Sequence, residues 1–239
     1  MGYRDPLSND ILQSRDKIDF LEITADHFLQ SPTVRWRFLD KLCSQYTLIP
    51  HGLNLSLGSA EGLNLEYLND LIELIKYVKP PWWSEHIAFT KAGEIEIGHL
   101  SPLAFNRESI GAFCENVHKV QDKIETPLIL ENITYNIDLP WNEMEENKFL
   151  GEILDRTGCG LLLDVTNLFI NAKNHEYDPI QFLETIPAER IIQLHFVGGM
   201  IKEGKWIDNH SENTQDDIFI LIESVLKYAP VKGIILERD

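Results

Sequence analysis

The stretch Gly158-Cys-Gly-Leu-Leu-Leu-Asp164-Val-Thr-Asn167 decides the fold class. Its run of leucines is entered through glycine and ends on an acid, which predicts a strand buried on both faces, as strands of parallel sheets are. Asp164 then stands at the carboxyl end of the strand, the end at which parallel α/β folds carry their chemistry. Asn167 can turn back toward the same point. The plain alternative is that Asp164 only caps the following helix.

The composition predicts one ordinary globular domain over residues 1–239. Hydrophobic residues make up 44% of the chain and charged residues 25%, and no linker divides it. The sequence has no apolar run long enough to span a membrane and no signal peptide, so we expect no membrane partner and a cytoplasmic location.

The charge balance is strongly acidic. Lys and Arg number 21 against 38 Asp and Glu, a formal net charge of −17. Such a chain repels phosphate backbones, so we expect no nucleic-acid partner, and part of the acidity can serve as metal ligands. Cys43, Cys114 and Cys159 lie far apart without a CxxC pair, which argues against a disulfide framework and a thiolate zinc site. We expect them to be buried free thiols.

Strands and helical stretches alternate along the whole chain. The expected strands are a stump at Gly2 followed by Ile18–Thr24, Thr47–Pro50, Trp82–Phe89, Pro127–Asn132, Gly158–Asp164, Ile191–Val197 and Gly233–Glu237. Eight strands separated mostly by helices predict an α/β fold of the TIM (β/α)8 type, with an abbreviated first strand and no final helix. No GxGxxG or GxxxxGKS motif follows a strand, which disfavours a nucleotide-binding fold.

Metal-competent side chains stand where successive strands end. They are His51, His86, Glu131, Asp164, His195 and Glu237. A barrel gathers the carboxyl ends of its strands around one mouth, so residues nearly two hundred apart in sequence become neighbours. Each of them alone has an ordinary structural explanation. Six at six strand ends predict a metal centre at which these residues take part in catalysis.

Three further donors extend this set. Asp208 and His210 lie in an expected loop, and their two-residue spacing puts both side chains on one side of an extended chain. With Asn167 the donors number nine and include no thiolate. This set suits iron, manganese or zinc and excludes copper(I). Nine donors exceed the roughly six positions of one ion, so we expect two or three metals with bridging carboxylates.

Four other polar residues are candidates for supporting roles. Glu22 points inward by strand alternation, while Glu85 and Asn132 neighbour proposed ligands and alternate to the opposite face. We expect the latter two to hydrogen-bond the ligand shell. His175 lies in an expected polar loop over the mouth, where contact with substrate and a purely structural role both remain open.

The motifs resemble a known family. The order His, His, Glu, Asp-x-x-Asn, His, Asp-x-His, Glu resembles the metal pattern of the xylose-isomerase-like superfamily, which includes endonuclease IV. More specifically, the chain is similar to the multinuclear non-heme iron-dependent oxidative enzymes, typified by the methanobactin-biosynthesis oxygenase. The motifs that carry this likeness are His51-Gly, Leu55-Ser-Leu-Gly-Ser59, Ser84-Glu-His86, Leu130-Glu-Asn132, the stretch from Gly158 to Asn167, Asn174-His175 and Glu237-Arg-Asp. The endonuclease pattern has histidine where Asn167 stands.

The resemblance implies a function. Members of the family modify a ribosomally made precursor peptide with dioxygen, often at cysteine, by means of two or three iron ions of mixed Fe2+/Fe3+ valence. Many work with a separate or fused peptide-binding partner protein. The alternatives are a zinc- or manganese-dependent phosphodiesterase, a sugar isomerase or epimerase using Glu131 and Glu237, and a metal-free barrel that acts as a binding module.

A nuclease assay separates the first two functions. We expect no cleavage of an abasic-site DNA duplex, because the acidic surface repels phosphates and no Lys- or Arg-rich strip offsets it. Gel electrophoresis after incubation with Zn2+ or Mn2+ is the measurement. Cleavage that is abolished both by a chelator and by Glu237→Gln would support the phosphodiesterase.

Overall fold

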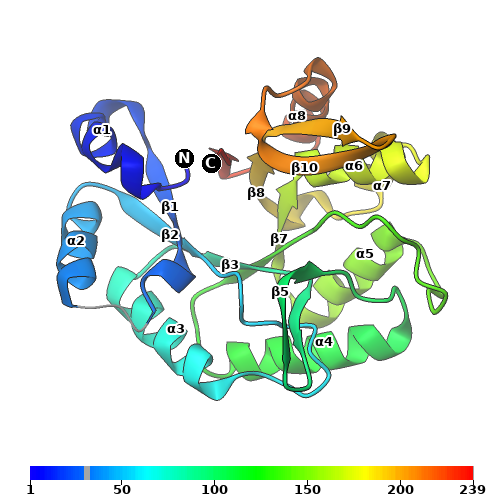
Figure 1. The fold of residues 1–239 in the computed structure, drawn as a ribbon, viewed down its shortest axis with the longest axis horizontal. Coiled ribbons are helices and arrows are strands. Elements are labelled where there is room, and N and C mark those ends of the chain that lie inside the picture. Colours follow the sequence, from blue (N-terminus) through cyan, green and yellow to red (C-terminus); the bar gives the residue numbers. More distant parts are fainter. Residues whose placement is uncertain (30–32, 239) are drawn as a thin grey trace.

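A seven-stranded parallel sheet forms the centre of the computed structural model, which describes residues 1–29 and 33–238. In their order across the sheet the strands are β1 (Phe20–Thr24), β2 (Thr47–His51), β3 (Trp83–His86), β6 (Leu128–Glu131), β7 (Gly160–Asp164), β8 (Ile191–Phe196) and β11 (Gly233–Leu236). Each strand pairs in parallel with its neighbour. The spatial order follows the chain order, and the sheet curls into a near-closed barrel whose two ends lie close together (Figure 1).

β7 is the buried strand that its leucine run predicts. Leu161, Leu162 and Leu163 are fully buried, and the preceding Gly158 ends a helix in the left-handed conformation. Gly160 allows the two neighbouring strands to approach closely. A Cβ at this position would lie 2.6 Å from the Ile192 side chain and 2.9 Å from that of Ile129.

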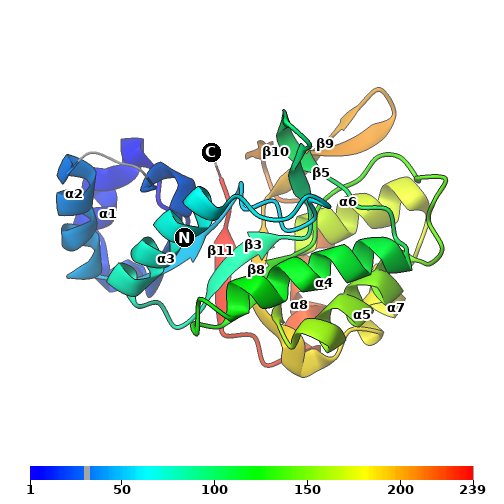
Figure 2. The same cartoon turned by 90° about the horizontal axis from the view of Figure 1, so that it is seen from below.

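Helices surround the sheet, and most of them follow a strand (Figure 2). They are α1 (Ser8–Gln13), α2 (Thr33–Cys43), α3 (Leu65–Val78), α4 (Arg107–Gln121), α5 (Glu146–Thr157), α6 (Val165–His175), α7 (Pro179–Glu184) and α8 (Asp216–Tyr228). α3 is typical: Asn64 caps its first turn, and Leu68, Leu71 and Ile75 form a buried stripe. Among the described residues, no helix is long and apolar enough to cross a membrane.

The abbreviated first strand is confirmed as a single bridge. Gly2 forms one parallel bridge with Glu22 of β1, and no further strand extends it within the described residues. β1 and β11 are the two edge strands of the sheet. The Phe20 ring of β1 lies 2.7 Å from where a Cβ of Gly233 would stand, so a side chain of β1 reaches β11. The described chain has no helix after β11, whose outward Ile234 and Leu236 are 39% and 42% exposed.

Two hairpins differ from the sequence expectation. One consists of β4 (Phe89–Ala92) and β5 (Ile95–Ser101), the other of β9 (Gly198–Lys202) and β10 (Lys205–Glu212). The expectation that Asp208 and His210 lie in a loop is therefore wrong, because both belong to β10. The polar sequence of β10 lacks the hydrophobic alternation by which a strand is predicted, because β10 pairs with β9 and not with the central sheet.

Two further expectations are corrected. The polar loop predicted around His175 is wrong, because α6 continues through that residue. Asn167 and Asn171 of α6 are buried, so these polar residues stand on its inward face and interrupt the usual amphipathic pattern. The expectation of three buried thiols holds for Cys114 and Cys159, whereas Cys43 is free but exposed at the end of α2.

The close packing at Gly160 gives a stability prediction. Gly160→Ala should lower the free energy of unfolding by about 1–3 kcal/mol, because the new methyl group overlaps the Ile192 and Ile129 side chains. Gly151→Ala is the matched control. It lies within α5 with open space around its would-be Cβ and should raise stability by about 0.5–1 kcal/mol. Urea unfolding measures both, and equal midpoints for the two variants would contradict the packing argument.

Candidate metal centre

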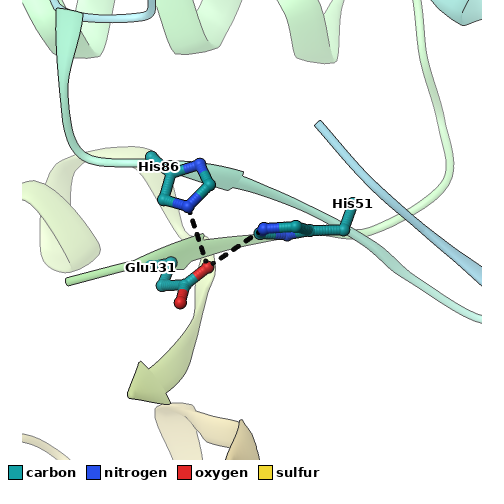
Figure 3. A group of neighbouring side chains, drawn as sticks. All are labelled: His51, His86 and Glu131. Atoms are coloured by element: carbon teal, nitrogen blue, oxygen red, sulfur yellow. Dashed lines mark ion pairs between the residues drawn. The ribbon is translucent and has the colours of Figure 1, made fainter. Parts of the chain in front are cut away.

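Glu131, at the end of β6, lies between two histidines from neighbouring strands. Its Oε2 is 3.4 Å from Nε2 of His51 and 3.2 Å from Nε2 of His86 (Figure 3). All three side chains are buried. Because β2, β3 and β6 are consecutive in the sheet, their ends bring the three together, and their ligand atoms lie within 4.8 Å of one another.

The same glutamate belongs to a second group on the other side of the barrel. Its Oε1 is 3.3 Å from Nδ1 of His195, and Oε2 of Glu237 is 3.1 Å from the same nitrogen. Asp164 completes this group, whose ligand atoms also lie within 4.8 Å of one another. One carboxylate oxygen of Glu131 faces each group, which is the arrangement of a bridging ligand.

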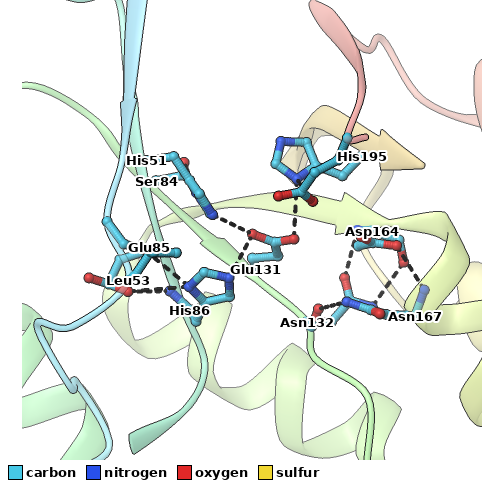
Figure 4. Close-up of polar contacts among 12 residues, drawn as sticks. His51, Leu53, Ser84, Glu85, His86, Glu131, Asn132, Asp164, Asn167 and His195 are labelled. Atoms are coloured by element: carbon cyan, nitrogen blue, oxygen red, sulfur yellow. Dashed lines mark hydrogen bonds and ion pairs between the residues drawn. The ribbon is translucent and has the colours of Figure 1, made fainter. Parts of the chain in front are cut away.

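Each histidine of the two groups is oriented through its other ring nitrogen. Nδ1 of His51 lies 2.8 Å from the Ser84 hydroxyl, and Nδ1 of His86 lies 3.1 Å from the carbonyl oxygen of Gly52. Such contacts fix the ring and aim the remaining nitrogen at the ion in metal proteins. Here the remaining nitrogens point at Glu131 (Figure 4).

The third histidine is held by a chain of contacts that the sequence reasoning found only in part. Nε2 of His195 lies 2.9 Å from Oε2 of Glu22, which is buried as its alternation predicts. Gln193, fully buried, donates its amide to the same oxygen at 2.6 Å and accepts from the Trp82 indole at 2.8 Å. The two-residue alternation that places Glu22 inward also places Gln193 beside His195, so the signal was present in the sequence.

Glu85 and Asn132 both hydrogen-bond backbone next to the proposed ligands. Oε1 of Glu85 accepts the His86 amide at 2.9 Å, and its Oε2 accepts the Leu55 amide at 3.2 Å. Asn132 bonds both backbone groups of Asp164, at 2.9 Å to the amide nitrogen and 3.1 Å to the carbonyl oxygen (Figure 4). These contacts fix the ends of β3 and β7 at the centre.

Asp164 fits both interpretations of its position. Its Oδ1 accepts the backbone amide of Asn167 at 2.7 Å and so caps α6. The same side chain belongs to the group around Glu131. Asn167 donates its own amide to the Asn132 carbonyl at 3.0 Å, which leaves its side-chain oxygen available.

Asp208 and His210 line the same cavity as the central ligands. The cavity has a volume of about 170 Å3 and also borders His51, His86, Glu131, Asp164, Asn167 and Glu237. A bulge in β10 between Asp208 and Glu212, together with the left-handed backbone of His210, sets the direction of the pair. Nε2 of His210 lies 2.8 Å from Oδ2 of Asp208.

His175 does not reach the centre. Its Nε2 lies 2.9 Å from the carbonyl oxygen of Tyr135, and its ring stacks on the Tyr135 ring with centroids 4.1 Å apart. It lines a different cavity. The extension of α6 through this residue accounts for the difference from the expected position over the mouth.

The donor atoms of the centre fit metal ions. Six buried side-chain atoms among the described residues lack a hydrogen-bond partner, and four of them belong to this site: Oε2 of Glu131, Oδ1 of Asn167, Nδ1 of His195 and Oδ1 of Asp208. Buried polar atoms without a partner are costly, and cations bound among these donors would satisfy them. The oxygen and imidazole donors suit iron, manganese or zinc.

Comparison with known proteins identifies the family. A family model described as RiPP precursor modification enzyme MbnB/TglH/ChrH matches residues 1–239. The chain belongs to this family. A UPF0276 protein of Caulobacter vibrioides is 33% identical over 241 residues, covering 100% of this chain and 86% of its own. A UPF0276 protein of Shewanella oneidensis is 33% identical over 238 residues, covering 99% and 84%.

Solved structures of sugar epimerases share the fold of this family member. D-psicose 3-epimerase from Clostridium cellulolyticum H10 gives a TM-score of 0.66 at 10% identity, covering 99% of this chain and 81% of its own. L-ribulose 3-epimerase gives 0.59 at 16% identity, covering 98% and 76%. These likenesses confirm the TIM-barrel fold and concern the fold alone.

The electrostatics of the family member's centre also favour a cation. Burial, together with the charges of Glu131, Asp208 and Glu237, raises the pKa of Asp164 well above its usual value. Burial lowers the pKa of His86, but the charges of Glu131 and Glu85 outweigh it and raise this pKa to about 9. Without a metal, protons therefore have to balance the crowded carboxylates.

Metal uptake by this family member should release protons. The hydrogen bond to Asp208 raises the pKa of His210 to about 9, as the carboxylates do for His86, so both imidazoles hold a proton at neutral pH in the metal-free protein. A metal must displace these protons. Affinity should rise about tenfold per pH unit for each proton released, up to about pH 9. Titration of metal-free protein with Zn2+ at several pH values measures this, and a pH-independent affinity would contradict it.

Proposed function

We propose that this chain is an iron-dependent oxidative enzyme that uses dioxygen to modify a ribosomally synthesised precursor peptide at cysteine. The convergence of unpartnered buried donor atoms around Glu131 is the observation that carries the metal part of the proposal. Membership of a peptide-modifying family supports the substrate class. A separate or fused peptide-binding partner protein, as the resemblance implies, belongs to the same proposal.

Two or three iron ions would share the donors of the centre. His51, His86 and Glu131 would hold one ion, and Glu131, Asp164, His195 and Glu237 another. Asp208, His210 and Asn167 would complete the set from the remaining wall of the cavity. When bound, iron supplies the redox chemistry with dioxygen and a Lewis acid for a substrate thiolate.

The chain's own residues set the conditions for this chemistry. Leu53, Leu100 and Ile133 line the cavity with apolar surface and restrict water near the ligands. Asn167 offers a neutral amide oxygen, a weaker donor than imidazole, so it would hold an ion less tightly than a histidine would and leave it open to exchange of other ligands. In the metal-free protein the His210–Asp208 pair holds a proton, with the His210 pKa at about 9, and an ion bound to His210 would displace it.

Metal analysis under anaerobic conditions tests the proposal. Protein expressed with ample iron should carry two or three equivalents, because Glu131 joins two ligand groups. Glu131→Gln should remove most of the iron, while Asp208→Ala should remove about one equivalent. Glu73→Gln, an exposed glutamate on α3, is the matched control and should leave the iron content unchanged.

Dioxygen consumption provides the second measurement. The iron-loaded protein should take up dioxygen in the presence of a cysteine-containing precursor peptide, and Glu131→Gln should lose this uptake. Zinc or manganese in place of iron, with no dioxygen uptake, would contradict the proposed reaction. Iron at one equivalent or less would contradict the multinuclear centre.

A further inference from the structure

A second and larger cavity lies beside the metal centre. It has a volume of about 520 Å3 and is bordered by α5, α6, α7 and the connection between β6 and α5, elements that Figures 1 and 2 both place on one side of the sheet. Aromatic and acidic side chains line it: Phe105, Tyr135, His175, Tyr177 and Phe182, with Asp138, Glu145, Glu146 and Asp178. The described residues that line it include no lysine and no arginine.

Glu146 is the buried acid of this cavity. Only 7% of its surface is exposed, and it opens the first turn of α5. Its carboxyl accepts from the Tyr177 hydroxyl at 3.1 Å and from the Asn171 amide at 3.3 Å, both neutral donors. Burial raises the pKa of Glu146 to about 8, more than these hydrogen bonds lower it. A guest cation would supply the charge that the neutral donors lack.

The aromatic rings add a second reason for a cationic guest. Tyr135 stacks on His175, and Tyr177 stacks on Phe182 with ring planes 17° apart. Aromatic faces attract ammonium and guanidinium groups, and the attraction is strongest where water is excluded. Asp138 and Asp178, both exposed, place further negative charge at the rim. Buried acid, aromatic walls and acidic rim together match an organic cation.

We propose that this cavity binds the cationic side chain of a lysine or arginine in a peptide. The inference rests on the proposed function for the peptide and names one feature by which the peptide is recognised. A cavity of this volume accommodates a whole long side chain, and its mixed aromatic and acidic lining suits both the aliphatic stem and the charged head.

One backbone segment joins this cavity to the metal centre. Ile133 and Thr134 line the centre, and Tyr135 lines the second cavity. Asn171 holds this segment, accepting the Tyr135 amide at 3.1 Å and donating to the Ile133 carbonyl at 3.0 Å. Asn167 touches the centre one helical turn earlier on α6. A basic residue held here would therefore anchor the peptide next to the reacting position.

Calorimetric titration of the purified full chain tests the site. The probes are N-acetylarginine amide and N-acetylcitrulline amide, which have the same shape but differ in charge. The arginine compound should bind at least roughly tenfold more tightly, because a hydrogen bond to a charged group is worth more than one to a neutral group. Equal affinities would overturn the proposal.

Two variants locate the binding. At pH 9, above the Glu146 pKa of about 8, Glu146→Gln should lower the affinity for the arginine compound roughly tenfold, since the amide keeps the shape and loses the charge. Gln181→Lys, at an exposed position of α7 that lines the cavity, should lower it by placing a competing ammonium there. Glu184→Gln changes the net charge by the same unit on the same helix, does not line the cavity, and should leave the affinity unchanged.

Three outcomes would overturn the assignment. Wild-type affinity in folded Glu146→Gln or Gln181→Lys protein would show that the arginine compound does not bind in this cavity. An equal loss in Glu184→Gln would indicate general charge attraction. Binding of free spermidine without binding of the blocked arginine would exclude a peptide side chain. The assay needs neither bound iron nor turnover, so its failure leaves the proposed function standing, and loss of the oxidative activity leaves the affinity difference standing.

Discussion

The site depends on the contacts of the Glu131 carboxylate, which lies between the two groups of candidate ligands. Its two oxygens face histidines from opposite parts of the barrel, with His51 and His86 on one side and His195 on the other. A carboxylate can serve both sides only if the strand ends converge, and the curled parallel sheet provides this convergence. The surrounding contacts of Ser84, Gly52 and Glu22 then turn each imidazole toward it.

The sequence could predict the residues whose direction is set by the alternation of side chains along a strand. The leucine run ending at Asp164 predicts a buried parallel strand, and β7 has that form. Alternation along a strand predicts the inward direction of Glu22, and the structure places its carboxylate against His195. Such patterns work because the period of two depends on the backbone alone.

The sequence could not predict in the same way the residues whose placement depends on tertiary contacts. β10 has no hydrophobic alternation to reveal it, since its partner is the other arm of a hairpin, and its bulge sets the direction of Asp208. The buried face of α6 includes asparagines as well as apolar residues. Its polar sequence near His175 therefore has the composition typical of a loop. The cavity around Glu146 arises where α5, α6 and α7 meet, and no local pattern signals a meeting of three helices.

Glu22 links the first residues of the chain to the metal centre. Its backbone bonds the N-terminal segment, with Tyr3 N donating to Glu22 O at 2.7 Å and Glu22 N donating to Met1 O at 3.0 Å. Its side chain meanwhile holds His195. The pairing of β1 with residues 1–3 and the orientation of His195 therefore depend on the same residue, and a displacement of Glu22 would disturb both. An ion that held His195 in place would then also slow exchange of the Tyr3 and Glu22 amide hydrogens.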